Sequence, residues 1–212
     1  MPIIIFEVVA SYDLWIWHAF LGLPGSLNDI NVLDRSPVFQ EMYEDRAPKC
    51  EYVVNDHHYN IGYYLSDGIY PQWATFVKTI PLPQGPKKKL FAERQESVRK
   101  DVERAFGVLQ ARFAIVRGPA RLMDQTEIGI IMRVCVILHN MIVEDERDNY
   151  ELAFDYDIVE GTVPEPIVNH DHHPCYETYF ERSCQVCSSK THLALQADLI
   201  EEIWKRSSGR RP

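Results

Sequence analysis

Three acidic residues occupy positions from which carboxylates could bind a divalent metal. Asp29 follows a tight Pro-Gly-Ser turn, Asp67 ends a predicted strand before a glycine, and Glu103 lies at the edge of the apolar stripe of a predicted helix. Acids brought from separate elements to one sheet edge suit Mg²⁺ or Mn²⁺, because these hard cations prefer carboxylate oxygens and water. Two such ions can activate a water molecule and stabilise the leaving oxygen of a phosphodiester. The hypothesis is therefore a metal site for phosphodiester cleavage.

Each acid also has a simpler interpretation. Asp29 is suited to cap a helix, and Glu103 is spaced to pair with Arg99 one helical turn earlier. Most of the 31 acidic residues are expected to be solvated. Spacing alone favours these structural roles over metal binding.

The elements that would position the acids are short strands in the first half of the chain. Residues 2–10 and 13–21 are rich in β-branched and aromatic residues and predict an antiparallel pair. Residues 50–65 are predicted to be extended, with a strand that ends on Asp67. Helix signals occupy residues 72–80, and short helices are predicted after Asn28-Asp29 and after Pro37.

The second half of the chain is predicted to be helical. Apolar residues spaced by three and four indicate an amphipathic helix over 91–116, and a second helix over about 126–146 is apolar on nearly every side and thus expected to be central. Residues 175–207 lack Gly and Pro and predict a helix or helix pair. We therefore expect an α/β core over 1–146, an acidic flexible linker over 147–174 and a C-terminal helical segment over 175–207.

Composition limits the classes of protein. The 212 residues are 46% apolar and 25% charged, as in a soluble globular protein. The net charge of −9 argues against binding nucleic acid through bulk charge, but residues 87–121 hold ten bases and four acids, which is +6 locally. This stretch fits either a phosphate-facing surface or a solvated helix face. The apolar stretch 128–143 carries Arg133 and His139 and is expected to be too short and too polar to span a bilayer.

A zinc site is a further hypothesis. Cys184-x-x-Cys187 has ligand spacing, and other candidate ligands are nearby: His170, His172, His173, Cys175 and His192. Because both cysteines fall in a predicted helix and no second such pair follows, helix-face thiols are favoured. The odd number of cysteines, five, favours free thiols in a reducing compartment. His139 is expected to be a hydrogen-bonded core residue, with a structural role near the site left open.

Four short blocks resemble one protein family. They are Pro24–Asp29 (PGSLND), Tyr64–Pro71 (YLSDGIYP), Val102–Leu109 (VERAFGVL) and Cys135–Met141 (CVILHNM), in this order. Together they closely resemble transposases of the PIF/Harbinger superfamily, especially its plant members, over about residues 3–148.

The resemblance implies an RNase-H-like DDE catalytic core, a mixed sheet flanked by helices, that cleaves and transfers DNA with divalent metal. Matched by motif, its metal-binding acids correspond to Asp29, Asp67 and Glu103, with Mg²⁺ or Mn²⁺ as the cofactor. The implied partners are DNA and a separate Myb-like DNA-binding protein that assists nuclear entry, so the nucleus is the expected location. Lys87 to Lys89 are too few to form a clear import signal.

The sequence departs from the family pattern at its start. The family's first catalytic aspartate lies on the opening strand, upstream of the segment that resembles Ile3 to Ala10, and neither Glu7 nor Asp13 stands in its motif. The expectation is an incomplete, N-terminally truncated core, a nuclease by descent with impaired activity. The alternative is a non-catalytic domesticated or remnant transposase that acts as a chromatin or protein interaction module.

Overall fold

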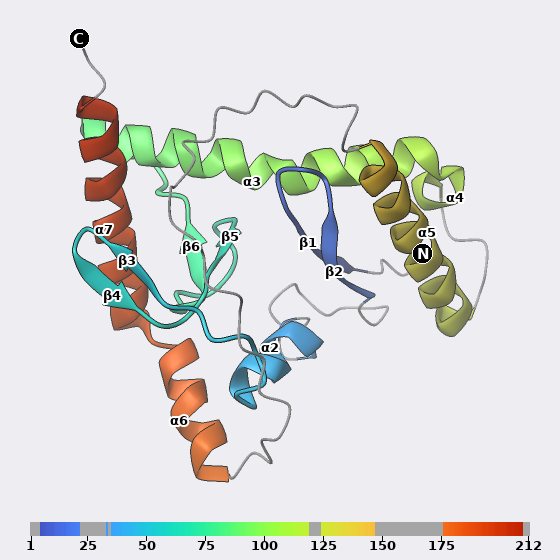
Figure 1. Cartoon of the computed structure of the whole chain (residues 1–212), viewed down its shortest axis with the longest axis horizontal. Coiled ribbons are helices and arrows are strands. Elements are labelled where there is room, and N and C mark those ends of the chain that lie inside the picture. The colour runs from blue at the N-terminus through green and yellow to red at the C-terminus, as the bar shows by residue number, and fades with distance from the viewer. Residues whose placement is uncertain (1–4, 22–32, 34, 119–123, 147–175, 210–212) are drawn as a thin grey trace. The chain divides into compact units, whose positions relative to one another are not determined.

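The chain divides into two units, each with its own sheets and helices. The computed structural model describes residues 5–21, 33, 35–118, 124–146 and 176–209 (Figure 1). The first unit comprises Met1–Gly25 and Lys100–Pro164, and the second comprises Ser26–Arg99 and Glu165–Pro212. The long helix α3 (Pro86–Arg112) contributes residues to both. The described part is mixed α/β, as predicted, with small sheets of two strands each.

The first unit contains the predicted antiparallel strand pair. β1 (Phe6–Ala10) pairs with β2 (Ile16–Leu21), so the expectation for residues 2–10 and 13–21 is confirmed over the described residues. The register is regular from Phe6 to Val9 and then shifts, since Val9 lies opposite His18 and Ala10 opposite Ile16. Trp17 is therefore the extra residue of a β-bulge.

Helices cover this hairpin. The predicted helix over 91–116 is present as α3, which begins earlier at Pro86 and ends at Arg112, and α4 (Ala114–Arg117) follows. Proline is suited to the first helical position because that position needs no backbone N–H donor. α5 (Gln125–Glu146) is the second predicted helix. The core of the unit consists of Ile16, Ala105, Leu109, Cys135 and Val136.

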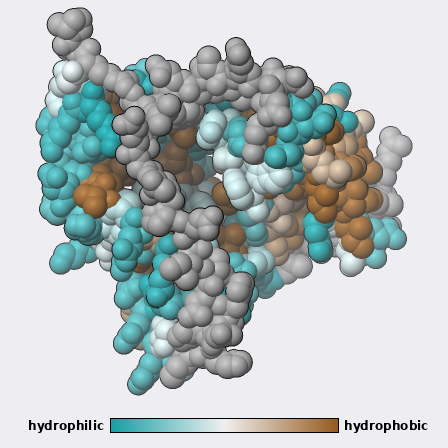
Figure 2. Space-filling model, in the orientation of Figure 1, coloured by the Kyte–Doolittle hydropathy of each residue, from teal (hydrophilic) through white to brown (hydrophobic). Residues whose placement is uncertain are grey.

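One face of α5 is exposed, contrary to the prediction of a central helix. The apolar residues on this face are between 42% and 62% exposed, and they are Ile130, Val134, Ile137, Leu138 and Met141. At 3.6 residues per turn they lie opposite the side that buries Val136, His139 and Val143. Figure 2 shows the hydrophobic side chains gathered over α5. The prediction was wrong because α5 packs on one two-stranded sheet and has no second described layer to cover its other side.

The length and composition of α5 also bear on whether this helix could span a membrane. Thr126–Glu146 is long and apolar enough to span a bilayer, with a mean hydropathy of 1.6. The helix is thus longer than the stretch 128–143 judged from sequence. The expectation that this stretch is too short and too polar to span a bilayer was therefore wrong by length and composition, two criteria that core helices of soluble proteins also meet.

The second unit contains the other strands. β3 (Tyr52–Val54) and β4 (His57–Tyr59) form a hairpin whose turn residues, Asn55 and Asp56, both have positive φ. Two positive φ values are the requirement of a type I′ turn, which Asn and Asp tolerate. β5 (Tyr64–Ser66) pairs in parallel with β6 (Phe76–Lys78).

The predicted helix over 72–80 was wrong, since β6 occupies this segment. Phe76 and Val77 are adjacent and both buried. Two adjacent buried side chains point to opposite faces of a strand, which is the pattern of a strand covered on both sides. Pairing with β5 therefore outweighs the local helix signal.

Three further helices complete the second unit (Figure 1). α2 (Pro37–Tyr43) confirms the helix predicted after Pro37, and α6 (Tyr176–Val186) with α7 (Ser189–Ser208) confirms the C-terminal helix pair. α7 packs on β3 and β6 and places Leu195 and Ile200 in a core with Val54, Val77 and Phe91. The helix predicted from Asn28-Asp29 and the linker 147–174 lie outside the described residues, and the domain boundaries drawn from sequence stay a prediction.

Candidate functional site

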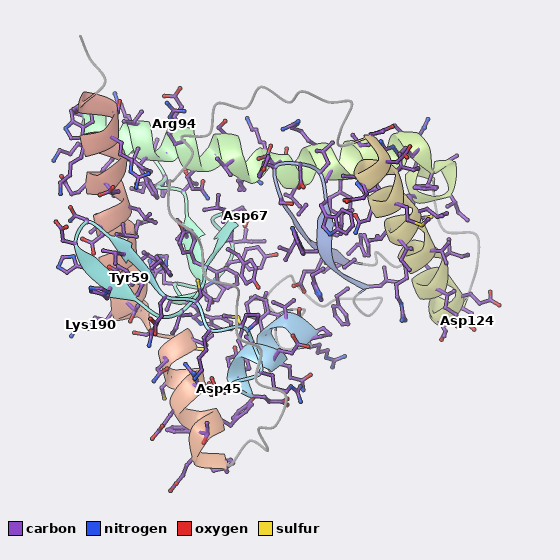
Figure 3. The ribbon with its side chains drawn as sticks, in the orientation of Figure 1. Asp45, Tyr59, Asp67, Arg94, Asp124 and Lys190 are labelled. Atoms are coloured by element: carbon purple, nitrogen blue, oxygen red, sulfur yellow. The ribbon has the colours of Figure 1, made fainter. Side chains whose placement is uncertain are left out.

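Asp67 lies at the carboxyl edge of the parallel pair β5–β6, as the sequence predicted. It follows Ser66, the last residue of β5, and Ser66 is opposite Lys78, the last residue of β6. Asp67 Oδ1 accepts a hydrogen bond from the backbone N–H of Ile69 at 3.1 Å, which closes the turn at Gly68. Figure 3 shows Asp67 at this end of β5. A carboxylate is thus held at a sheet edge, where carboxyl ends of parallel strands commonly place ligands.

A buried glutamine fixes this edge. Gln95 on α3 is 4% exposed, and its Nε2 donates to the carbonyl oxygens of Ser66 at 3.0 Å and Val77 at 3.1 Å. The helix is therefore joined to the carboxyl ends of both strands, directly before Asp67. Gln95 was not among the residues predicted from the sequence. The available signal was a polar residue four positions after Phe91, on the apolar side of the helix.

Replacing Gln95 with alanine is expected to lower the free energy of unfolding by about 2 kcal/mol, because two buried carbonyl oxygens lose their donor. Urea denaturation followed by circular dichroism measures the change. Gln110→Ala, at an exposed position of the same helix, is the control and is expected to stay within about 0.5 kcal/mol. Equal stability of the two variants would contradict a bracing role for Gln95.

The other two predicted ligands are not joined to Asp67 by the structure. Glu103 is exposed on the part of α3 that belongs to the first unit, whereas Asp67 belongs to the second. Asp29 lies outside the described residues. Among the described residues, no group of three or more His, Cys, Asp or Glu side chains could hold a metal ion. The site of three acids stays a prediction.

Ion pairs neutralise part of the basic segment. Lys87 binds Glu201 at 2.6 Å, Arg99 binds Glu96 at 2.7 Å, and Arg104 binds Asp101 at 2.7 Å. Arg112 forms a further pair with Glu146. Glu96 and Asp101 are already included in the count of +6, whereas Glu201 and Glu146 lie outside residues 87–121, so the pairs of Lys87 and Arg112 make the local excess of positive charge smaller in its effect than that count.

Among the residues that the structure describes, no third zinc ligand joins Cys184 and Cys187. Cys184 is exposed on α6, and Cys187 Sγ lies 3.9 Å from the hydroxyl of Tyr43. His192 is buried, with Nδ1 2.8 Å from the carbonyl oxygen of Phe76. The remaining candidates, His170, His172, His173 and Cys175, lie outside the described residues. His192 thus has a structural partner. Cys184 is a helix-face thiol, as expected, but Cys187 lies in the turn between α6 and α7, so the prediction that one helix carries both cysteines was wrong.

His139 and Asn140 join α5 to the turn before β2. His139 is fully buried, and its Nε2 lies 2.9 Å from the carbonyl oxygen of Leu14. A carbonyl only accepts, so Nε2 carries the proton. Burial lowers the pKa of His139 and keeps the ring neutral at pH 7. Asn140 accepts from the N–H of Ile16 at 3.0 Å and donates to its carbonyl at 2.8 Å. The prediction of a hydrogen-bonded core histidine is confirmed.

A second polar cluster joins the β3–β4 hairpin to α7. Asp198 accepts hydrogen bonds from Asn55 at 3.0 Å and from the hydroxyl of Tyr59 at 2.5 Å, and it lies 2.9 Å from His57 Nδ1. Lys205 donates to Asn55 at 2.6 Å. Burial alone would raise the pKa of Asp198, but the hydrogen bonds from Tyr59 and Asn55 and the charge of His57 hold it below its ordinary value. Tyr59, labelled in Figure 3, correspondingly has a raised pKa, through burial and the hydrogen bond to Asp198.

Comparison with known proteins gives one family. The sequence model of the family described as plant transposon protein matches residues 1–150. A curated relative, Protein ALP1-like from Arabidopsis thaliana, is 23% identical over 217 residues, which cover 95% of the chain and 46% of the relative. The chain therefore spans about half the length of this relative. No solved structure matches the chain.

Proposed function

Because the chain belongs to the plant transposon protein family, its origin is a transposase, and we propose that its ancestral chemistry is cleavage of DNA phosphodiester bonds by a divalent-metal-dependent, RNase-H-like DDE core. The observation that carries the proposal is Asp67. It stands at the carboxyl edge of two parallel strands, braced by Gln95 from the helix that also carries Glu103.

The donor chemistry fits Mg²⁺ or Mn²⁺. Asp29, Asp67 and Glu103 would hold the ion through carboxylate oxygens, which hard cations prefer. When bound, the metal would activate water or a 3′-hydroxyl and stabilise the leaving oxygen. The hydrogen bond from Ile69 to Asp67 would keep one carboxylate oxygen in place at the sheet edge.

The family pattern calls for one more aspartate, on a strand that precedes Ile3. A polypeptide of residues 1–212 alone is therefore proposed to bind metal but to cleave DNA poorly, because a missing metal ligand costs far more activity than a change behind the ligands. DNA, a Myb-like DNA-binding partner and the nucleus complete the proposal by resemblance to the PIF/Harbinger superfamily.

Isothermal titration calorimetry with Mg²⁺ or Mn²⁺ tests the metal site. Saturable binding is expected for the chain, and its loss is expected in the variant Asp29→Asn, Asp67→Asn, Glu103→Gln, because amides lack the charge that hard cations require. A variant with Asp124→Asn and Glu127→Gln, exposed acids on and before α5, is the matched control and should bind as the original chain does. Equal and negligible binding in all three would sink the catalytic proposal.

One observation favours a second function. The exposed apolar face of α5 is unusual for a monomeric surface and is of the kind that protein partners cover. With a net charge of −9, it supports a non-catalytic transposase remnant that acts as a chromatin or protein interaction module. Under this alternative the metal titration shows no binding that depends on Asp29, Asp67 and Glu103.

A further inference from the structure

The β-bulge of the first unit leaves the side chain of Trp17 exposed to solvent. Trp17 has no opposite residue on β1, because Val9 pairs with His18 and Ala10 pairs with Ile16. Its side chain is 69% exposed. Bulges commonly re-aim a side chain at functional sites. An exposed tryptophan at a bulge is therefore a candidate for a binding contact.

Hydrogen bonds within the turn hold the indole in place. Trp17 Nε1 donates to Ser11 Oγ at 2.9 Å, Ser11 Oγ donates to the Asp13 carboxylate, and Asp13 accepts the backbone N–H of Trp15 at 3.3 Å. The Trp15 ring lies beside that of Trp17, with centroids 6.1 Å apart. Since the polar atom of the indole already has a partner, the exposed ring offers its apolar face and not a hydrogen bond.

Two side chains of α5 bind the backbone of this turn and stabilise its unfavourable conformation. Leu14 has φ of 69°, a left-handed conformation that costs free energy for a residue with a Cβ atom. The carbonyl of Leu14 is bound by His139, and both backbone groups of Ile16 are bound by Asn140. The unfavourable conformation is thus stabilised by two side chains from a distant part of the chain, which act on the turn that displays Trp17.

We propose that Trp17 is a stacking contact for an unpaired base of DNA, with His139 and Asn140 as its positioning residues. This rests on the proposed function, which supplies DNA as the partner. A single rigid ring suits one flat base. A protein partner would need a wider apolar patch, of the kind that the exposed face of α5 offers, whereas among the described residues of 5–21 the other large exposed hydrophobic side chain is Tyr12. The carboxylate of Asp13 is occupied by Ser11 and the N–H of Trp15, which moderates its repulsion of phosphates.

Binding of a fluorescein-labelled DNA single strand of about 20 nucleotides, measured by anisotropy, tests the proposal, and a blunt duplex of the same length is the comparison. Trp17→Ala is expected to weaken single-strand binding by about ten-fold, since stacking on aromatic rings contributes that much per base. Trp17→Phe should recover most of the affinity. Phe180→Ala, which removes an exposed aromatic ring from α6, is the control and should change nothing. Duplex binding should fall by less than about two-fold in Trp17→Ala, because paired bases are already stacked.

The outcomes separate the inference from the proposed function. Unchanged single-strand binding by Trp17→Ala, with binding retained by the original chain, would refute the stacking site and leave DNA binding in place. Equal losses on single strand and duplex would refute it as well. No binding of either DNA by the original chain would overturn both the inference and DNA as the partner. Trp17→Ala should keep its circular dichroism spectrum and unfolding midpoint, because the side chain is mostly exposed.

Discussion

Replacing Asn140 with leucine is expected to lower the free energy of unfolding of the first unit by about 3 kcal/mol, because two backbone groups lose their partner at once. The N–H and the carbonyl of Ile16 both bind the Asn140 amide, and Ile16 is buried. Leucine has similar volume and can satisfy neither group. Urea denaturation measures the loss, and hydrogen exchange locates it.

Two variants control this experiment. Asn140→Asp keeps an acceptor for the Ile16 N–H but loses the donor to the Ile16 carbonyl, so its loss of stability should fall between those of the original chain and Asn140→Leu. Met141→Leu, at an exposed position of α5, should stay within about 0.5 kcal/mol. Amides of residues 11–17 should exchange faster in Asn140→Leu. Protection that falls evenly over the whole chain would contradict a local role in the turn.

The strand pair, α3, α5 and the C-terminal helices could be predicted from sequence because their patterns are local. β1 and β2 are rich in β-branched and aromatic residues, and α3 repeats its apolar residues at three and four positions. β6 could not be predicted in this way. Phe76 and Val77 are buried on both faces, and a short apolar run of this kind does not separate strand from helix. Its parallel pairing with β5 is a contact between distant segments.

The candidate site was predictable in part for the same reason. Asp67 could be placed at a strand end because its strand and turn are adjacent in sequence. Gln95 was missed because its partners are backbone carbonyls of two other elements, which carry no sequence signal. The role of His139 and Asn140 likewise depends on contacts with residues 14–16, more than 120 positions away. A sequence motif identifies the residue types of a site, whereas long-range hydrogen bonds determine which groups each of these residues contacts.

Asp198 is expected to make the stability of the second unit depend on acid pH. Its pKa in the folded chain lies below the ordinary value of 3.8, because hydrogen bonds from Tyr59 and Asn55 and the charge of His57 outweigh its burial. A carboxyl group whose folded pKa is lowered stabilises the fold above its unfolded pKa. The stabilisation is thus complete above about pH 5 and is lost as the pH falls past 3.8 and through the folded value.

Urea denaturation of Asp198→Ala and of the original chain between about pH 6 and pH 3 measures this contribution. At pH 6 the variant should be less stable by about 3 kcal/mol, since the Tyr59 hydroxyl and the Asn55 amide lose a charged partner that is 13% exposed. The difference should shrink as the pH falls, because protonated Asp198 accepts these hydrogen bonds more weakly. Asp56→Asn, an exposed acid in the turn of the same hairpin, should show no such convergence. A difference between Asp198→Ala and the original chain that stays constant over this range would mean that Asp198 stabilises the hairpin by packing and not by its charge.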